Sequence, residues 1–201
     1  LGEVTAIRPN ENLIETSIGS IDYDYLIIAT GAKTNFFGNT QIEAKAMAMK
    51  TITDAIRVRN HVIRNMEFAL LYDDMENMNS LMDFVVVGGG PTGVELAGAL
   101  AELKNNVFPK DYPELDISQM DIHLVDANDR LLNGMSVDSG EKAKLYLEQM
   151  GVTVLTNARV KSYDGYTLEF ENGQKLITRT VIWAAGVKGN PVEGLKSESI
   201  G

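Results

Sequence analysis

The sequence predicts an α/β fold in which a parallel sheet with flanking helices is joined to a small β-meander. Three observations indicate this class. The apolar run 84–87 has the composition of a strand buried on both faces, as strands of parallel sheets are. A glycine-rich turn and then a helical pattern at 94–103 follow that run directly. Further along, Asp164-Gly165 and Asn172-Gly173 are typical hairpin turns, which predict the antiparallel meander.

The composition is that of a globular domain and excludes several classes of protein. Of the 201 residues, 44% are apolar and 23% are charged, unlike a disordered or fibrous chain. The net charge of −10 argues against nucleic acid as a partner, because binding a duplex requires a concentrated basic surface. Without cysteine, the sequence has no disulfide, no thiolate metal site and no redox-active cysteine pair. Its apolar runs are far shorter than the ~20 residues of a membrane-spanning helix.

The first fifty residues indicate short strands followed by an irregular segment. Strands are predicted at 4–7 and 13–16, on either side of a turn at 9–12. The run 25–29 is continuous and apolar, which predicts a strand buried on both faces. Residues 32–50 have no clear periodicity and are interpreted as a crossing segment.

A helix is predicted over residues 55–72, because apolar side chains recur on one face and Thr53 or Asp54 can cap its first turn. Residues 73–83 are polar and rich in methionine, which indicates a turn region whose methionines fill gaps in the packing.

The second half alternates strands and helices. After the helix at 94–103, residues 105–118 break the pattern and are interpreted as an inserted loop. A second strand is predicted at 121–125 and a helix at 138–150, which Gly151 ends. Another buried strand is predicted at 180–184.

Two segments of the chain end in the same pattern of strands and small residues. Segments 4–31 and 160–186 both read as a small meander, then an apolar strand that ends in a small residue and glycine. The interval from Gly88 to Gly186 is 98 residues, and the same interval counted back from Gly31 falls before residue 1. We therefore expect a first glycine-rich loop upstream of this sequence, which would make the chain a fragment.

The spacing Gly88-x-Gly90-x-x-Gly93 lies between a strand and a helix, and a later strand ends in an acid. In this context Gly88 permits a tight turn, Gly90 lets the backbone approach a pyrophosphate, and Gly93 lets the helix pack against the strand. The free N–H groups at the helix start would then hold the phosphates. The alternative is a glycine-rich turn without a ligand.

Asp126, at the end of the second strand, is the candidate specificity residue. A carboxylate there accepts hydrogen bonds from the ribose hydroxyls and repels a 2′-phosphate, so NAD(H) is favoured over NADP(H). It lies 33 residues after Gly93, more than the usual ~20, and the segment 105–118 accounts for the excess. Two alternatives stay open. Arg130 lies nearby in the sequence, which leaves NADP(H) as a ligand, and Asp126 is otherwise an ordinary acid at the end of a strand.

Glu95 is predicted in the first turn of the helix. Its functional interpretation is a carboxylate facing the nicotinamide ring, and its structural interpretation is an acid stabilised by the helix dipole. No spacing of His, Asp or Glu matches a metal site or a nucleophile-base pair, so a dinucleotide is the only redox-active group that the sequence indicates.

Three motifs in order resemble the two-dinucleotide-binding-domain flavoproteins, the superfamily of the pyridine nucleotide-disulfide oxidoreductases. The variant is similar to type II NADH:quinone oxidoreductases, the single-subunit NADH dehydrogenases. The motifs lie at residues 25–32, 88–98 and 181–187, and the resemblance covers essentially the whole chain.

The resemblance implies a Rossmann-like NAD(P)-binding domain with a parallel sheet and a β-meander, flanked by partial FAD-domain segments. It assigns residues 1–38 to the first half of the FAD-binding domain, 39–50 to a crossing linker, 51–187 to the NADH-binding domain and 188–201 to the return toward the FAD domain.

The resemblance also implies roles for individual residues. The residues that would contact the pyrophosphate of NADH are Gly88, Gly90, Thr92 and Gly93, and Asp126 would contact its adenosine ribose. The nicotinamide ring would lie beside Glu95, Ala185 and Gly186. The FAD would lie beside Thr30 and Gly31.

The activity implied is hydride transfer from NADH to FAD, followed by electron delivery to a membrane quinone. The full-length protein would attach peripherally to the cytoplasmic side of the membrane through regions absent here, and the fragment would be inactive alone. A homodimer is possible. Alternatives are an NAD(P)H reductase of a ferredoxin, rubredoxin or nitrite reductase system, and a non-catalytic NADH sensor.

Overall fold

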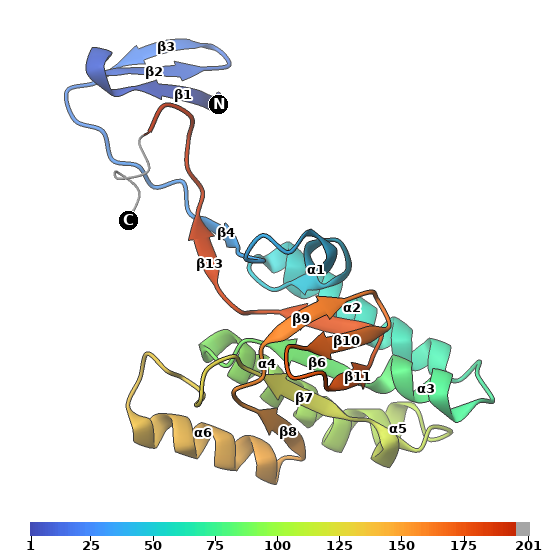
Figure 1. Ribbon diagram of the computed structural model, residues 1–201. Coiled ribbons are helices and arrows are strands. Elements are labelled where there is room, and N and C mark those ends of the chain that lie inside the picture. Colours follow the sequence, from blue (N-terminus) through green and yellow to red (C-terminus); the bar gives the residue numbers. More distant parts are fainter. Residues whose placement is uncertain (196–201) are drawn as a thin grey trace. The chain divides into compact units, whose positions relative to one another are not determined.

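The computed structural model describes residues 1–195, which form two compact units (Figure 1). The larger unit comprises Thr34–Gly186. The smaller unit combines Leu1–Lys33 with the chain from Val187 onward.

A five-stranded parallel sheet forms the centre of the larger unit, in the order β5-β12-β6-β7-β8. The strands are β5 (Met47–Ala48), β6 (Phe84–Val87), β7 (Ile122–Val125), β8 (Val152–Leu155) and β12 (Thr180–Trp183). All four residues of β6 and of β12 are buried, because elements cover both faces of these central strands. The α/β class and the parallel sheet that the sequence predicts are therefore confirmed.

Helices cover one face of the sheet (Figure 1). They are α2 (Ile52–Ala69), α3 (Met75–Met82), α4 (Pro91–Glu102), α5 (Phe108–Asp111) and α6 (Val137–Gln149), while the short α1 (Thr40–Lys45) packs near β9. Thr51 and Asp54 form a reciprocal capping box at the start of α2, so this helix begins three residues before the predicted position.

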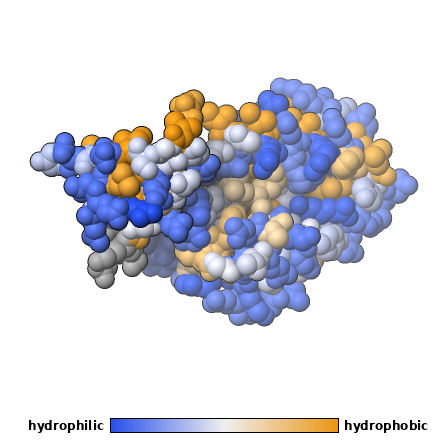
Figure 2. Space-filling model, turned by 90° about the horizontal axis from the view of Figure 1, so that it is seen from above, coloured by the Kyte–Doolittle hydropathy of each residue, from blue (hydrophilic) through white to orange (hydrophobic). Residues whose placement is uncertain are grey.

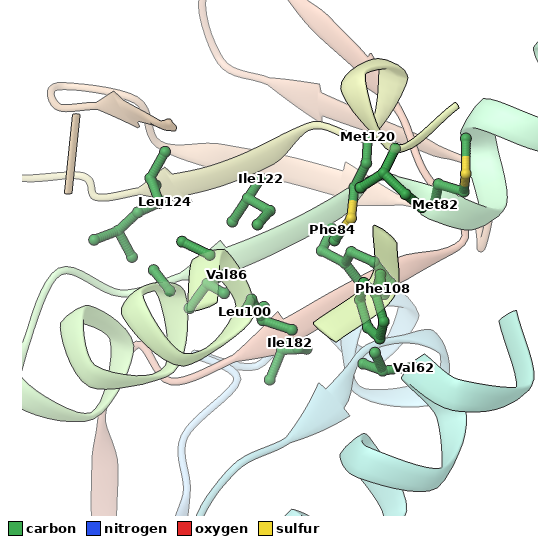
Figure 3. Close-up of a cluster of buried hydrophobic side chains, with 14 of the residues drawn as sticks. Val62, Met82, Phe84, Val86, Leu100, Phe108, Met120, Ile122, Leu124 and Ile182 are labelled. Carbon is green, nitrogen blue, oxygen red and sulfur yellow. The ribbon is translucent and has the colours of Figure 1, made fainter. Parts of the chain in front are cut away.

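Alternate residues of β6 face two separate hydrophobic clusters. Phe84 and Val86 pack with the helices in the cluster shown in Figure 3, together with Leu100 of α4. Val85 and Val87 face the opposite side, where they pack with the meander. This alternation follows from the two-residue period of a strand.

The meander consists of β9 (Val160–Tyr163), β10 (Thr167–Phe170) and β11 (Lys175–Ile177), paired antiparallel. The turns between them contain Gly165 and Gly173, both with positive φ, as the sequence predicts. Its buried side chains Tyr163, Leu168 and Phe170 cover the sheet.

The smaller unit contains a second antiparallel meander, as the internal similarity of the sequence predicts. It is formed by β1 (Val4–Arg8), β2 (Leu13–Thr16) and β3 (Gly19–Asp22), with a 3₁₀ turn at Pro9–Glu11. β4 (Ala32–Thr34) pairs with β13 (Val187–Gly189).

The predicted strand at 25–29 is wrong. These residues are irregular, and the side chains of Tyr25 and Ile27 are 95% and 89% exposed. Within residues 1–195 no strand pairs with this run, and an isolated apolar segment cannot satisfy its backbone groups as a buried strand. Figure 2 shows that hydrophobic residues, drawn in orange, are exposed on the face of the molecule seen there.

Two further segments are more helical than predicted. Residues 73–83 contain α3, capped by the Asp74 side chain, and the buried Met82 fills the core as expected of a methionine there. Residues 105–118 continue α4 through a π-helical turn, Leu103–Val107, into α5. Buried Phe108 holds this segment on the core, so tertiary packing overrides its weak helical pattern.

The segment interpreted as a crossing linker contains α1 and β5, and β5 is the edge strand of the parallel sheet. Its packing is therefore part of the larger unit. Among the helices of residues 1–195, none combines the length and apolar character required to span a bilayer.

Candidate functional site

The site lies at the topological switch point of the sheet, where strands that follow and precede one another in the chain lie on opposite sides of β6. From β6 the chain proceeds to β7 and β8 on one side, while β12 lies on the other side of β6. Val87, Val125 and Trp183 are in register at the carboxyl ends of these three strands. In open α/β sheets, ligands bind outside the carboxyl ends of the strands at this switch point.

Each predicted glycine of the loop after β6 has a distinct structural reason. Gly88 has a φ of +116°, and a Cβ on it would lie 2.6 Å from the backbone of Ala184. A Cβ on Gly93 would lie 1.8 Å from the carbonyl oxygen of Gly88, so the helix packs directly on the loop. Gly90 has nothing within 4 Å of the position of a Cβ. Two glycines thus close the turn, and the third leaves open space for a ligand.

The start of α4 borders that open space. Gly90 is the N-cap and makes no side-chain cap, and Pro91 occupies the first helical position, where its missing N–H costs nothing. The first N–H groups of a helix have no intrahelical acceptors, and the helix dipole favours an anion beside them. The loop is therefore suited to binding phosphate groups.

Asp126 is tied to the same loop. Its carboxylate accepts hydrogen bonds from the backbone N–H of Gly89 and from Asn128, whose backbone N and Nδ2 lie 2.7 and 2.8 Å from Oδ1. These bonds fix the orientation of the carboxylate at the cavity wall.

Arg130 is bonded to the backbone of the loop before α6 and is not among the residues that line the cavity over the strand ends. Its guanidinium donates to the carbonyl oxygens of Asn133, Met135 and Ser136 at 2.8, 3.2 and 3.3 Å. These bonds tie Arg130 to the loop before α6, and whether it reaches a 2′-phosphate stays an open alternative.

A cavity of about 710 Å³ opens over the strand ends, within the range of small-molecule sites. One wall contains Gly88, Gly90, Thr92 and Asp126. The opposite wall comes from two segments, the residues before α1 and the start of the meander. The lining residues outside the predicted set include Phe36, Phe37, Asn128, Arg159, Lys161, Glu171 and Trp183.

The cations at the rim are paired with acids. Arg159 Nε lies 3.8 Å from Glu171 Oε2, and Lys161 Nζ lies 2.7 Å from Glu169 Oε1. The bond from Lys161 holds the pKa of Glu169 below its usual value. Since three of the four side chains are solvent-exposed and that of Glu169 is partly exposed, these pairs are weak and can rearrange around a ligand.

Of the predicted site residues, Gly88, Gly90, Thr92, Asp126, Ala185 and Gly186 all line this cavity, and Gly93 lies directly beneath its loop. Glu95 is exposed, belongs to the second turn of α4 because the helix begins at Pro91, and is not among the lining residues. Thr30 and Gly31 belong to the smaller unit, where both bond to Asn190. Roles toward nicotinamide and FAD stay predictions for these three residues.

Sequence reasoning missed most of the residues that line the cavity. Phe37 comes from the stretch before residue 39 that the resemblance assigns to the FAD-binding domain, and Arg159 and Lys161 come from the start of the meander, so only the tertiary fold brings them to the site. Asn128 alone carried a local signal, because an asparagine two residues after an aspartate commonly closes a turn on it.

The two histidines lie away from the cavity. His61 Nε2 lies 3.0 Å from Thr180 Oγ1, and burial, with the charge of Arg64, lowers the pKa of His61. Burial likewise lowers the pKa of His123. Among residues 1–195, no three His, Asp or Glu side chains gather in a position to hold a metal ion.

The residues present fit a dinucleotide. The open space at Gly90 and the start of α4 suit a pyrophosphate, while Asp126 and the aromatic residues offer a ribose acceptor and flat apolar surfaces.

Known proteins are similar to this chain in sequence and in fold. A protein of Mycobacterium tuberculosis named type II NADH:quinone oxidoreductase NdhA is 34% identical over 98% of this chain and 44% of its own length. An external alternative NAD(P)H-ubiquinone oxidoreductase, B1, of Arabidopsis thaliana is 32% identical over 90% of this chain and 33% of its own. The chain thus spans less than half the length of these curated relatives.

Among solved structures, NDH2 from Plasmodium falciparum in complex with NADH superposes with a TM-score of 0.84 at 26% identity, covering 94% of this chain and 41% of that one. A ferredoxin reductase from Rhodopseudomonas palustris has a TM-score of 0.70 at 15% identity, over 94% and 41% of the two chains, which shows the shared fold. The family model described as pyridine nucleotide-disulphide oxidoreductase matches residues 1–200. The superfamily indicated by the three sequence motifs is thereby confirmed, and the chain belongs to the pyridine nucleotide-disulphide oxidoreductase family.

Proposed function

We propose that this chain supplies the NADH-binding half of an FAD-dependent NADH:quinone oxidoreductase of type II. The observation that carries the proposal is the cavity at the switch point, in which the Gly88–Gly93 loop, the start of α4 and Asp126 converge. The names of the relatives support the reaction and the acceptor.

Each part of the cavity has a role in holding NADH. The loop and the first N–H groups of α4 would bind the pyrophosphate, with Gly90 permitting close approach. The carboxylate of Asp126 would accept hydrogen bonds from the adenosine ribose. Ala185 and Gly186 would border the nicotinamide at the end of β12, and Glu95 would act near the same ring.

The arrangement favours NADH over NADPH. A 2′-phosphate beside Asp126 would meet a fixed negative charge. The guanidinium of Arg130 is held on the carbonyl groups of the loop before α6 and is not among the cavity-lining residues. The rim cations Arg159 and Lys161 already have acidic partners.

The chemistry itself comes from the cofactors. Bound NADH would supply a hydride from C4 of its nicotinamide, and FAD would accept it and pass electrons to a quinone. The residues of this chain position the donor: they bind its phosphates, orient its ribose and border its reactive ring. Thr30 and Gly31 would lie by the FAD in the full-length protein.

Direct binding tests the proposal. Trp183, the only tryptophan, lines the cavity and is 5% exposed, so energy transfer from its indole to reduced nicotinamide reports occupancy. We expect saturable transfer when the purified chain is titrated with NADH, with at least about tenfold weaker binding of NADPH, equivalent to about 1.4 kcal/mol. Equal affinities would remove the role of Asp126, and absence of binding by both would refute the cavity as a dinucleotide site.

Gly98→Ala provides a matched control. Gly98 is on α4, where a Cβ would meet only Leu147 Cδ2 at 3.8 Å, and it is not among the lining residues. Its NADH titration should superimpose on that of the unmodified chain.

The acceptor and the location are proposals about the full-length protein. We expect it to reduce a membrane quinone and to attach peripherally, on the cytoplasmic side, through regions outside these residues; a homodimer is possible. Reduction of a quinone in liposomes by the flavin-loaded protein would support this. Preference for a ferredoxin or rubredoxin as acceptor would refute it and favour the reductase alternative.

A further inference from the structure

Phe37 is an aromatic residue in an unusual position. Its side chain is 68% exposed although it lines the cavity, and its backbone has a φ of +52°, a region that disfavours bulky side chains. Residues held in this region typically persist because the surrounding structure holds them there, and such positions cluster at functional sites.

Hydrogen bonds made by Asn35 hold Phe37 in this backbone conformation. Its Oδ1 accepts a hydrogen bond from the N–H of Phe37 at 2.9 Å, its backbone O accepts one from Trp183 Nε1 at 2.9 Å, and its N–H donates to the carbonyl oxygen of Gly186 at 3.1 Å. The loop that presents Phe37 is therefore fastened to the end of β12.

The neighbouring residues Phe36 and Phe37 differ in burial and in the residues that they contact. Phe36 is buried and packs on Trp183, with ring centroids 5.7 Å apart. Phe37 instead points its ring toward Gly186: a Cβ on Gly186 would lie 3.4 Å from Cζ of Phe37. A larger residue at 186 would crowd this ring.

The ring of Phe37 thus stands at the end of the cavity formed by β12, away from the Asp126 end. If Asp126 binds the adenosine ribose and the Gly88–Gly93 loop the pyrophosphate, the remaining planar ring of the dinucleotide extends toward Gly186. An exposed aromatic ring beside that path offers a flat apolar surface for stacking.

We infer that Phe37 is a positioning residue for the nicotinamide ring, which packs against its side chain. This inference rests on the proposed function and adds a specificity element at the end of the cavity opposite Asp126. The exposed ring and the positive φ at residue 37 both follow from that role.

The test compares two ligands that differ only at the nicotinamide. ADP-ribose contains the adenosine, the pyrophosphate and the second ribose of NADH but lacks the nicotinamide. Calorimetric titration of the chain with NADH and with ADP-ribose is made for the unmodified protein, Phe37→Gly and Phe37→Tyr. The control Phe68→Ala removes an exposed aromatic ring on α2, outside the lining residues.

Phe37→Gly should weaken NADH binding about fivefold or more and leave ADP-ribose binding unchanged. Its melting temperature should hold or rise, because glycine accepts a positive φ without strain. Phe37→Tyr keeps the ring and should retain NADH affinity, and Phe68→Ala should change neither ligand. A purely structural role for Phe37 predicts a lower melting temperature and equal losses for both ligands.

Equal weakening of both ligands, or no change in NADH binding, would overturn the inference. So would NADH binding to the unmodified chain no more tightly than ADP-ribose. If the unmodified chain binds neither ligand, the proposed function fails first, and this outcome is distinct from loss of the Phe37 contribution alone.

Discussion

Gly93 lies so close to the carbonyl oxygen of Gly88 that a Cβ on Gly93 would come within 1.8 Å of it. The start of α4 and the loop after β6 therefore form one packed turn, and the geometry of the loop depends on the absence of a side chain at residue 93.

Gly93→Ala should destabilise the chain by about 1–3 kcal/mol, because the helix must move away from the loop backbone to avoid the clash. Gly98→Ala, five residues along the same helix, should instead stabilise it by about 0.5–1 kcal/mol through the better helix propensity of alanine. Urea denaturation followed by far-UV circular dichroism measures both. Similar effects from the two substitutions would contradict the assigned contact.

Gly90→Ala should separate binding from folding. Gly90 has a φ of −75°, which alanine adopts readily, and its Cβ would meet no atom of the chain. Stability should therefore stay within about 0.5 kcal/mol of the unmodified value, while the methyl group would occupy the space of the pyrophosphate. Loss of NADH binding without loss of stability, measured with Trp183 fluorescence, is the expected result. Unchanged affinity would place the phosphates elsewhere.

Asp126→Asn should narrow the preference for NADH over NADPH and also cost about 1–3 kcal/mol of stability. An amide has a single acceptor oxygen and cannot accept from Gly89 and from Asn128 on both sides, so one of these N–H donors loses its bond to the carboxylate. Competitive titration with the two nucleotides measures the preference.

Arg130→Leu is the counterpart of that experiment. It removes the cation from the three carbonyl groups near α6, so stability should fall while the NADH preference is retained. A gain or loss of NADPH affinity in Arg130→Leu would show that this side chain reaches the nucleotide.

Asp83 should make stability depend on pH. Burial, together with the charge of Asp121, raises the pKa of its carboxyl from 3.8 to about 7, although a bond from the Asp121 N–H and the charge of Lys104 oppose the shift. The folded state then binds a proton that the unfolded state has lost, so the contribution is fully present below about pH 4 and is lost as pH rises through 7.

Asp83→Asn should remove this dependence and raise stability at pH 8, by about 1–2 kcal/mol after allowance for solvent screening of this half-buried group. The asparagine Oδ1 can still accept from the N–H of Asp121. Denaturation curves at pH 5, 6, 7 and 8 test it, and parallel pH profiles for the variant and the unmodified chain would refute the assignment.

Local sequence patterns predicted the part of the site that a continuous segment builds. The strand β6, its glycine-rich loop and α4 follow one another along the chain, and the contact of Gly93 with Gly88 lies within this segment. Asp126 was predicted for the same reason, because it directly follows β7.

Features that depend on distant partners were not predicted. The run 25–29 has the composition of a buried strand, but composition does not supply the neighbouring strand that it requires. Conversely, residues 105–111 are helical because Phe108 packs in the core. Phe37 and Arg159 reach the cavity only after the sheet and the meander have assembled.

The hydrogen bond from the Asn35 N–H to the Gly186 carbonyl joins the two boundaries of the larger unit. A unit whose two ends lie side by side tolerates excision, circularisation and insertion into a loop of another protein, because none of these changes requires its backbone to stretch. A gene segment encoding 34–186 should therefore yield an autonomous folding module, and its new termini, held side by side, are natural points for fusing a fluorescent reporter of nucleotide binding.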